Sequence, residues 1–152
     1  MASFKLHTTP LSFNSLRPEL VLAENSITDY EVVTADIATG SHKVSQNPLT
    51  SPLPSANSAL QAHANNGAAL EFMQKSLFGQ VPLLELDDTP LIEPRAIARV
   101  LATKYSDVQP SLIPDCASDL EAFALFEQAL SLETMKVDPY AGPLIYHKLI
   151  AP

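Results

Sequence analysis

The sequence predicts an α/β fold followed by a short all-helical part. Runs of strand-forming residues alternate with helix-type stretches in the order strand, helix, strand, and then, after a long interruption, strand, strand, helix. A further helix-type stretch, rich in apolar residues, occupies the C-terminal part of the chain. We therefore expect an α/β domain and an additional helical segment after it.

The first strand-helix-strand unit is expected within residues 4–37. Residues 4–7 form a short strand that ends at a Thr-Thr-Pro sequence. Ser15 has the residue type of a helix N-cap, and the apolar helix after it ends near Glu24. Residues 29–37 return as a strand, because Tyr30 and two valines have high β propensity.

The second unit is expected in the stretch "GQVPLLELDDTPLIEPRAIARVL". Gly79 loosens the backbone, Pro82 fixes its own φ, and the short strand that follows stops at two adjacent aspartates. A second strand covers residues 89–92. From Glu93 onward, apolar residues at 96, 97, 100 and 101 form the stripe of an amphipathic helix.

The turn before this hairpin has the features of a peptide-binding site. If the Val81–Pro82 bond is cis, the chain turns tightly and the backbone groups of Val81 face outward, where they can pair with an extended peptide. The helix that begins near Glu93 directs its positive end to the same place. A peptide that carries a carboxylate would suit both features.

The order of elements is the thioredoxin-like pattern. We expect a thioredoxin-like domain at residues 1–105, interrupted by an inserted loop at 44–70, and then a linker at 106–117. Residues 118–152 form a partial helical domain. It contains one long helix at 118–137 and a short helix after Pro139.

Several motifs of this sequence resemble those of one known protein family and occur in the same order along the chain. "FGQVP" and "ELDDTPLIEPRAIARVLATKY" resemble the glutathione-binding half of the glutathione transferases, closest to the phi class of plants and fungi. "TTPLSFNSLRPELVLAENSITDYEVVTADIATGSHK" is similar to the start of the same class, and "LETMKVDPYAGPLIYHKLIAP" to the first long helix of its second domain. The resemblance implies a thioredoxin-like glutathione-binding domain followed by part of an all-helical one, and a homodimer.

Ser12 is the catalytic candidate. A free thiol has a pKa near 8.5 and is mostly protonated at neutral pH, so glutathione needs a hydrogen-bond donor and a positive helix end to become a thiolate. Ser12 follows the first strand and precedes the first helix, and the resemblance implies this role for the serine of "PLS". Asn14 and Ser15 are alternative donors.

The resemblance also implies the binding residues for glutathione, which would be the co-substrate. His42 and Lys43 would meet its glycine carboxylate, and Gln80 with Val81 would hold its cysteinyl backbone. Glu93 would lie near the γ-glutamyl amine.

Residue 94 departs from the pattern. The family usually has a serine here, which binds the γ-glutamyl carboxylate, whereas Pro94 offers neither an N–H nor a hydroxyl. Arg95 could compensate. We assign Leu11 and Phe13, on either side of Ser12, to the pocket of the second substrate.

Two further departures concern length. Residues 44–70, rich in Ser, Pro, Asn and Ala, stand where the phi pattern has a very short connection. They are either a tolerated surface insertion or a lid over the second substrate. The helical part is shorter than in the family. Either the sequence is a fragment, or the missing helices are truly absent, and in the second case an apolar face would have to be covered by a partner chain or by the insertion.

Composition excludes several function classes. The net charge is −8 without clustered cations, which argues against nucleic acid as a partner. There is no run of 18 apolar residues and no signal peptide, and a single cysteine, Cys116, excludes an internal disulfide; we expect a cytoplasmic protein without membrane partners. The four histidines lack metal-ligand spacing, so no metal site is expected.

Three functions remain open at this point. In the first, the thiolate of glutathione attacks a small hydrophobic electrophile and stays attached. In the second, it adds to a conjugated double bond, allows rotation and leaves, as in a cis/trans isomerase of fungal secondary-metabolite biosynthesis. The third is a glutathione-binding module without catalysis.

Overall fold

The sheet has four strands in the order β2-β1-β3-β4. The computed structural model describes residues 3–10, 12–34, 72, 74–76, 78–108, 110–145 and 147–148. Strand β1 (Lys5–Thr8) pairs in parallel with β2 (Glu31–Thr34) and antiparallel with β3 (Leu83–Leu86), which pairs antiparallel with β4 (Thr89–Leu91). The sheet is therefore mixed, and the expected α/β class is confirmed.

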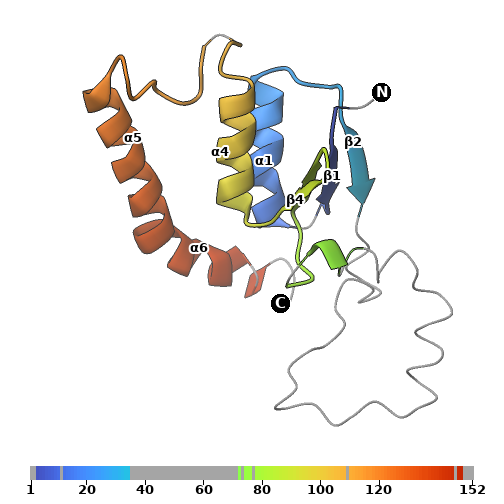
Figure 1. Ribbon diagram of the computed structural model, residues 1–152. Helices are drawn as coiled ribbons and strands as arrows, with labels where there is room; N and C mark the ends of the chain where they lie inside the picture. Colours follow the sequence, from blue (N-terminus) through green and yellow to red (C-terminus); the bar gives the residue numbers. More distant parts are fainter. Residues whose placement is uncertain are drawn as a thin grey trace, which may run out of the picture.

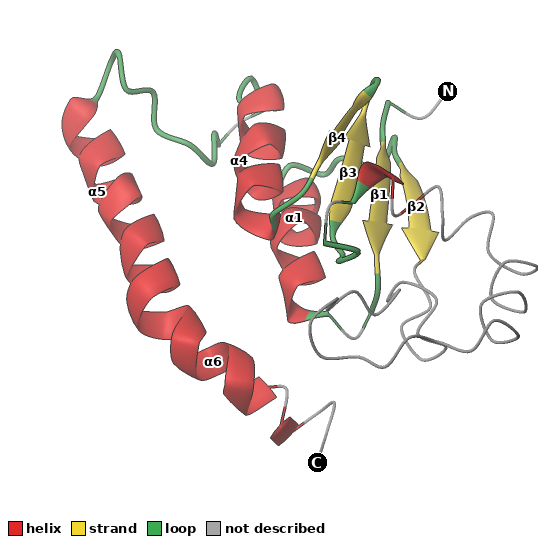
Figure 2. Ribbon diagram, turned by 60° about the horizontal axis from the view of Figure 1, so that its bottom comes forward, coloured by secondary structure: helices red, strands yellow, loops and turns green. Residues whose placement is uncertain are grey.

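Helices α1 (Phe13–Glu24) and α4 (Pro94–Lys104) lie side by side on one face of the sheet (Figures 1 and 2). The core between them consists of apolar side chains that are at most 4% exposed: Phe4, Leu6, Leu22, Leu84, Ile97 and Leu101. Leu6 and Leu84 are partners across the β1–β3 ladder, so they point to the same face of the sheet. Burial of this stripe fixes α4 on the sheet, and thereby its N-terminus at one end of the strands.

The start of α1 differs from the prediction. Ser12, and not Ser15, is the N-cap: its backbone is extended and its Oγ accepts a hydrogen bond from the backbone N–H of Ser15 at 3.3 Å. Ser15 lies in the first turn of the helix and is only 1% exposed. Two serines three positions apart both have the residue type of a cap, and residue type alone does not distinguish them.

The strand bounds also shift slightly. Strand β1 begins and ends one residue later than expected, and β2 begins at Glu31 instead of residue 29. Residues 35–37, which the sequence assigns to the same strand, lie outside the described part of the chain.

The C-terminal segment is continuous in the described residues, not two separate helices (Figure 2). Helix α5 (Leu120–Leu132) leads into a π-helical turn, η1 (Glu133–Val137), and then into α6 (Asp138–Ile145). The cap is Asp119, whose carboxylate accepts from the backbone N–H of Ala122 at 2.9 Å. Pro139 lies directly after η1, near the start of α6, and does not end the segment.

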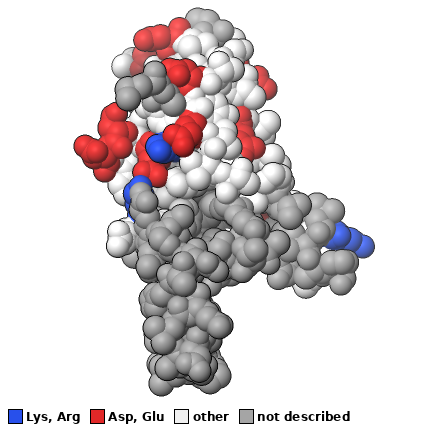
Figure 3. All heavy atoms as spheres, turned by 90° about the vertical axis from the view of Figure 1, so that its right-hand side faces the viewer, with Lys and Arg blue, Asp and Glu red and all other residues white. Residues whose placement is uncertain are grey.

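The segment α5–α6 runs beside α4 on the side away from the sheet (Figure 1). It exposes large apolar side chains along its length, among them Leu120, Leu125, Met135, Tyr140 and Leu144, each at least 60% exposed. No helix in the described part of the chain has the length and apolar character needed to cross a membrane. On the face shown in Figure 3, acidic side chains are spread over the described residues with few basic ones among them, as the net charge of −8 leads one to expect.

Candidate functional site

A cavity of about 210 Å³ opens where the loop before β3, the N-termini of α1 and α4, and α6 come together. Four residues at the predicted glutathione-binding positions line it: Gln80, Val81, Glu93 and Pro94. The Val81–Pro82 peptide bond is cis, so the condition stated above for a tight turn at this position is met. Gln80 and Val81, before the β3–β4 hairpin, and Glu93 and Pro94, after it, thus meet at this cavity.

Ser76 holds the loop on this side of the cavity. Its hydroxyl donates to the carbonyl oxygen of Gln80 at 3.2 Å and accepts from the backbone N–H of the same residue at 3.1 Å. Gly79 has φ of 59°, a left-handed conformation that glycine adopts without steric cost, and its N–H donates to the carbonyl oxygen of Ser76 at 3.0 Å. Ser76 is 1% exposed, so these bonds are shielded from water and fix the backbone of Gln80 and Val81.

Glu93 closes the other side with an unusual backbone. It is the N-cap of α4 at φ 74° and ψ 112°, and its side chain makes no capping hydrogen bond. A residue with a side chain in such a region costs of order 1 to 3 kcal/mol and persists only where the surroundings impose it. Pro94 follows at the first helical position and supplies no N–H, as predicted.

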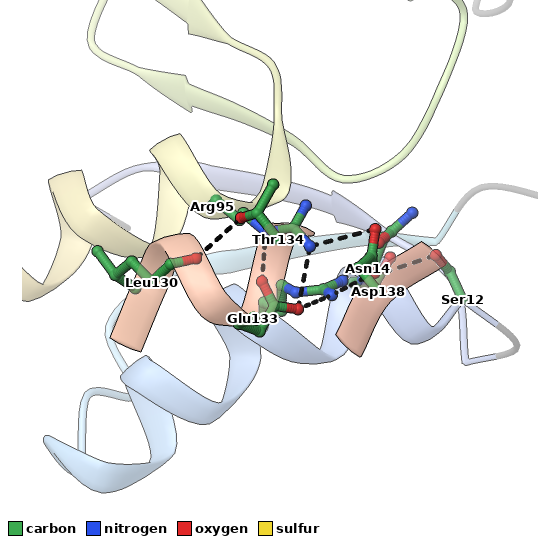
Figure 4. A network of polar contacts seen from close by, with 9 residues as sticks. Ser12, Asn14, Arg95, Leu130, Glu133, Thr134 and Asp138 are labelled. Carbon is green, nitrogen blue, oxygen red and sulfur yellow. Dashed lines mark hydrogen bonds and ion pairs between the residues drawn. The ribbon is translucent and has the colours of Figure 1, made fainter. Parts of the chain in front are cut away.

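Four charged residues form an ion-pair network beside the cavity (Figure 4). Arg95 of α4 donates to Glu133 of η1 at 2.6 and 3.0 Å and pairs with Asp138 of α6 at 3.2 Å. Arg17 of α1 donates to the same two carboxylates at 2.7 and 2.8 Å. The network joins α1 and α4 to the C-terminal helical segment, and two of its members, Arg95 and Asp138, also line the cavity.

The network sets the protonation state of Glu133. The hydrogen bonds from Arg95 are the main cause that lowers the pKa of Glu133 from 4.5 to about 2; burial opposes this, and the bond and charge of Arg17 add to it. The same contacts raise the pKa of Arg95, with the bond to Glu133 as the largest cause. Glu133 and Arg95 are therefore both charged over the physiological pH range.

Ser12 lies next to this region without lining the cavity. Its oxygen caps α1, and since a hydroxyl has one hydrogen and two lone pairs, this leaves the hydrogen for an outside acceptor. Asn14, one of the alternative donors, does line the cavity, and its Oδ1 accepts from Arg17 at 2.5 Å. Ser15, the other alternative, is buried and does not contribute to the wall.

The remaining predicted residues are distributed differently. Phe13 faces a second, largely apolar cavity of about 320 Å³ between α1, α4 and α5, where the guanidinium of Arg17 lies 4.7 Å from the centre of its ring. Leu11, His42 and Lys43 lie outside the described residues, as does the insertion at 44–70. Among the described residues, no group of three or more His, Cys, Asp or Glu side chains is arranged to hold a metal ion.

Sequence reasoning missed Ser76 and Asp138. Ser76 stands four residues ahead of Gln80, a spacing that would have allowed it to tie the loop. Asp138 had no local signal, because Asp-Pro is also a common turn sequence and its arginine partners are 43 and 121 positions away.

Known proteins resemble this chain in sequence. Glutathione S-transferase 3 of Zea mays is 34% identical over 152 residues, which is 100% of this chain and 55% of that protein. Glutathione S-transferase PM239X14 of Arabidopsis thaliana is 45% identical over 75 residues, 49% of this chain and 34% of that protein. No protein-family model matches the chain.

Solved structures give the same assignment. Glutathione transferase F7 from Populus trichocarpa superposes with a TM-score of 0.73 at 28% identity and covers 98% of this chain and 57% of that one. Glutathione S-transferase I bound with lactoylglutathione gives 0.69 at 28% identity, with 99% and 57% covered. The chain is thus a homologue of the phi-class glutathione transferases of plants and spans slightly more than half the length of relatives that match it from end to end.

Proposed function

We propose that the chain binds glutathione in the 210 Å³ cavity and activates it as a thiolate for attack on a small hydrophobic electrophile. The observation that carries this proposal is the meeting of Gln80 and Val81 with Glu93 at the cavity wall, held by the hydrogen bonds of Ser76. The relationship to a transferase solved with lactoylglutathione, a glutathione derivative, supports it.

The cavity offers groups for each part of the tripeptide. The backbone of Val81 can pair with the cysteinyl backbone, and the carboxylates of Glu93 and Asp138 can attract the γ-glutamyl amine. The thiol would then lie toward the start of α1, where the positive helix end and the hydroxyl of Ser12 lower its pKa. In the chemical step, the sulfur forms a bond to the electrophilic carbon, and the leaving group departs with its electron pair.

We expect this chain to bind glutathione more weakly than relatives that have a serine at the position of Pro94, directly after the glutamate. Pro94 cannot donate to the γ-glutamyl carboxylate, and Arg95 is already paired with two protein carboxylates. A hydrogen bond to a charged group contributes about 1.5 to 3 kcal/mol, so a restored donor should tighten binding about tenfold or more.

Isothermal titration of glutathione into three proteins tests binding. Pro94→Ala restores the backbone N–H alone, and Pro94→Ser restores the N–H and adds a hydroxyl. We expect the dissociation constant to fall in the order wild type, alanine variant, serine variant. Absence of binding in all three would refute the proposed function.

Turnover with an aryl halide tests the chemistry. Ser12→Ala should raise the pKa seen in the pH–rate profile and lower kcat about 10- to 1000-fold with little change in glutathione affinity. Ser12→Thr retains both the hydroxyl and the cap and is the matched control. Consumed glutathione indicates conjugation, whereas glutathione that is returned indicates the isomerase, and binding without either reaction indicates the non-catalytic module.

A further inference from the structure

Glu133 and Asp138 reach the same two arginines although they stand five positions apart. Arg17 contacts Glu133 at 2.7 Å and Asp138 at 2.8 Å, and Arg95 contacts them at 2.6 and 3.2 Å. In an α-helix with 3.6 residues per turn, residues i and i+4 share a face, whereas i and i+5 diverge by roughly 140°. A regular helix could therefore not present both carboxylates to one pair of guanidinium groups.

The π-helical turn removes this conflict. The backbone N–H of Asp138 donates to the carbonyl oxygen of Glu133, so the hydrogen bond spans five residues instead of four. Residues i and i+5 are then stacked as i and i+4 are in an α-helix. Asp138 consequently lies one turn above Glu133 on the same face and reaches the cavity wall.

We propose that η1 positions Asp138. The π-helical turn accommodates one extra residue in the long helical segment, so Asp138 lies on the same helix face as Glu133 and reaches both Arg17 and Arg95 and the cavity. This inference rests on the proposed function only for its effect on glutathione. Its effect on the ion-pair network is independent of any ligand.

Two length variants of η1 test the phase. Deletion of Met135, which is 68% exposed, places Asp138 four positions after Glu133, so the turn can relax to an α-helix with both carboxylates on the same face. Insertion of one alanine after Met135 places Asp138 six positions after Glu133 and rotates it away from the arginines. Each length variant, and the wild-type protein, is compared with its own Asp138→Asn derivative.

The measurements are urea unfolding and glutathione titration. In the wild-type and deletion backgrounds, Asp138→Asn should lower the folding equilibrium constant about 5- to 20-fold and weaken glutathione binding about tenfold. In the insertion background the same substitution should change both quantities less than twofold, because the carboxylate is already out of place.

The proposal is overturned if the deletion abolishes the effect of Asp138→Asn, since the π geometry itself would then be required. It is equally overturned if the insertion preserves that effect. Should the insertion variant not fold, the deletion background alone decides. A wild-type protein that binds no glutathione refutes the proposed function, while the unfolding comparison still decides the role of η1.

Discussion

Replacement of Glu133 by glutamine is expected to loosen the C-terminal helical segment from α1 and α4. Glu133 receives hydrogen bonds from Arg17 at 2.7 Å and from Arg95 at 2.6 and 3.0 Å. A pKa of about 2 in place of 4.5 corresponds to about 3.4 kcal/mol at 1.36 kcal/mol per pH unit. Because the side chain is 35% exposed, solvent screening reduces this contribution, and we expect a loss of about 1 to 2 kcal/mol.

The sign of the pH dependence follows from the direction of the shift. The folded-state pKa of Glu133 is lowered, so its contribution is complete above about pH 4.5 and is lost as the pH falls toward 2. Urea unfolding of wild type and Glu133→Gln should therefore differ at pH 7, differ less at pH 3, and converge as the pH approaches 2.

Glu127 provides a matched control. It pairs with Arg99 at 2.6 Å, but both side chains are about 40% exposed, and removal of such a pair should cost less than about 1 kcal/mol. Equal losses for Glu127→Gln and Glu133→Gln, or a loss for Glu133→Gln that persists unchanged to pH 3, would refute the reasoning.

Three other substitutions have defined outcomes. Ser76→Ala should weaken glutathione binding in titration more than it lowers stability, because it frees the loop that presents Val81; Ser111→Ala, at an exposed serine, is the control. Leu101→Ala should cost about 2 to 5 kcal/mol in urea unfolding, since the side chain is fully buried. Burial would raise the pKa of Glu85, but hydrogen bonds from Lys75 and His7 lower it overall. Glu85→Gln should therefore lower the free energy of unfolding by about 1 to 3 kcal/mol at neutral pH, and this loss should disappear in urea unfolding as the pH falls through the acid range.

The expected homodimer and the domain bounds at 105 and 118 remain predictions. Sedimentation equilibrium decides the first, and limited proteolysis in the linker decides the second.

Local patterns predicted most of the sheet and both helices that cover it. The stripe from Ile97 to Leu101 and the aspartate turn after Leu86 each combine a periodicity with a stop signal, so the elements follow from short stretches of sequence. The resemblance named Gln80, Val81, Glu93 and Pro94, and the structure brings these four together.

The contacts that sequence could not predict connect residues far apart in the chain. Arg95 and Asp138 share no local motif, and their contact depends on a π-helical turn for which no residue in "ETMKV" gives a signal. The cap of α1 was assigned to the wrong serine because the capping rule depends on residue type, which Ser12 and Ser15 share. The contact between Arg95 and Asp138 depends on tertiary packing, which local propensity does not encode.

The charges around the cavity explain why the helical segment both completes and limits the site. Arg17 and Arg95 supply two positive charges, and Glu133 and Asp138 neutralise them; Glu93 adds a further negative charge at the rim. An ammonium group is therefore attracted, whereas a carboxylate must compete with two protein carboxylates for Arg95 and finds no donor at Pro94. A ligand that enters this cavity should consequently gain more from its amino group than from the carboxylate beside it.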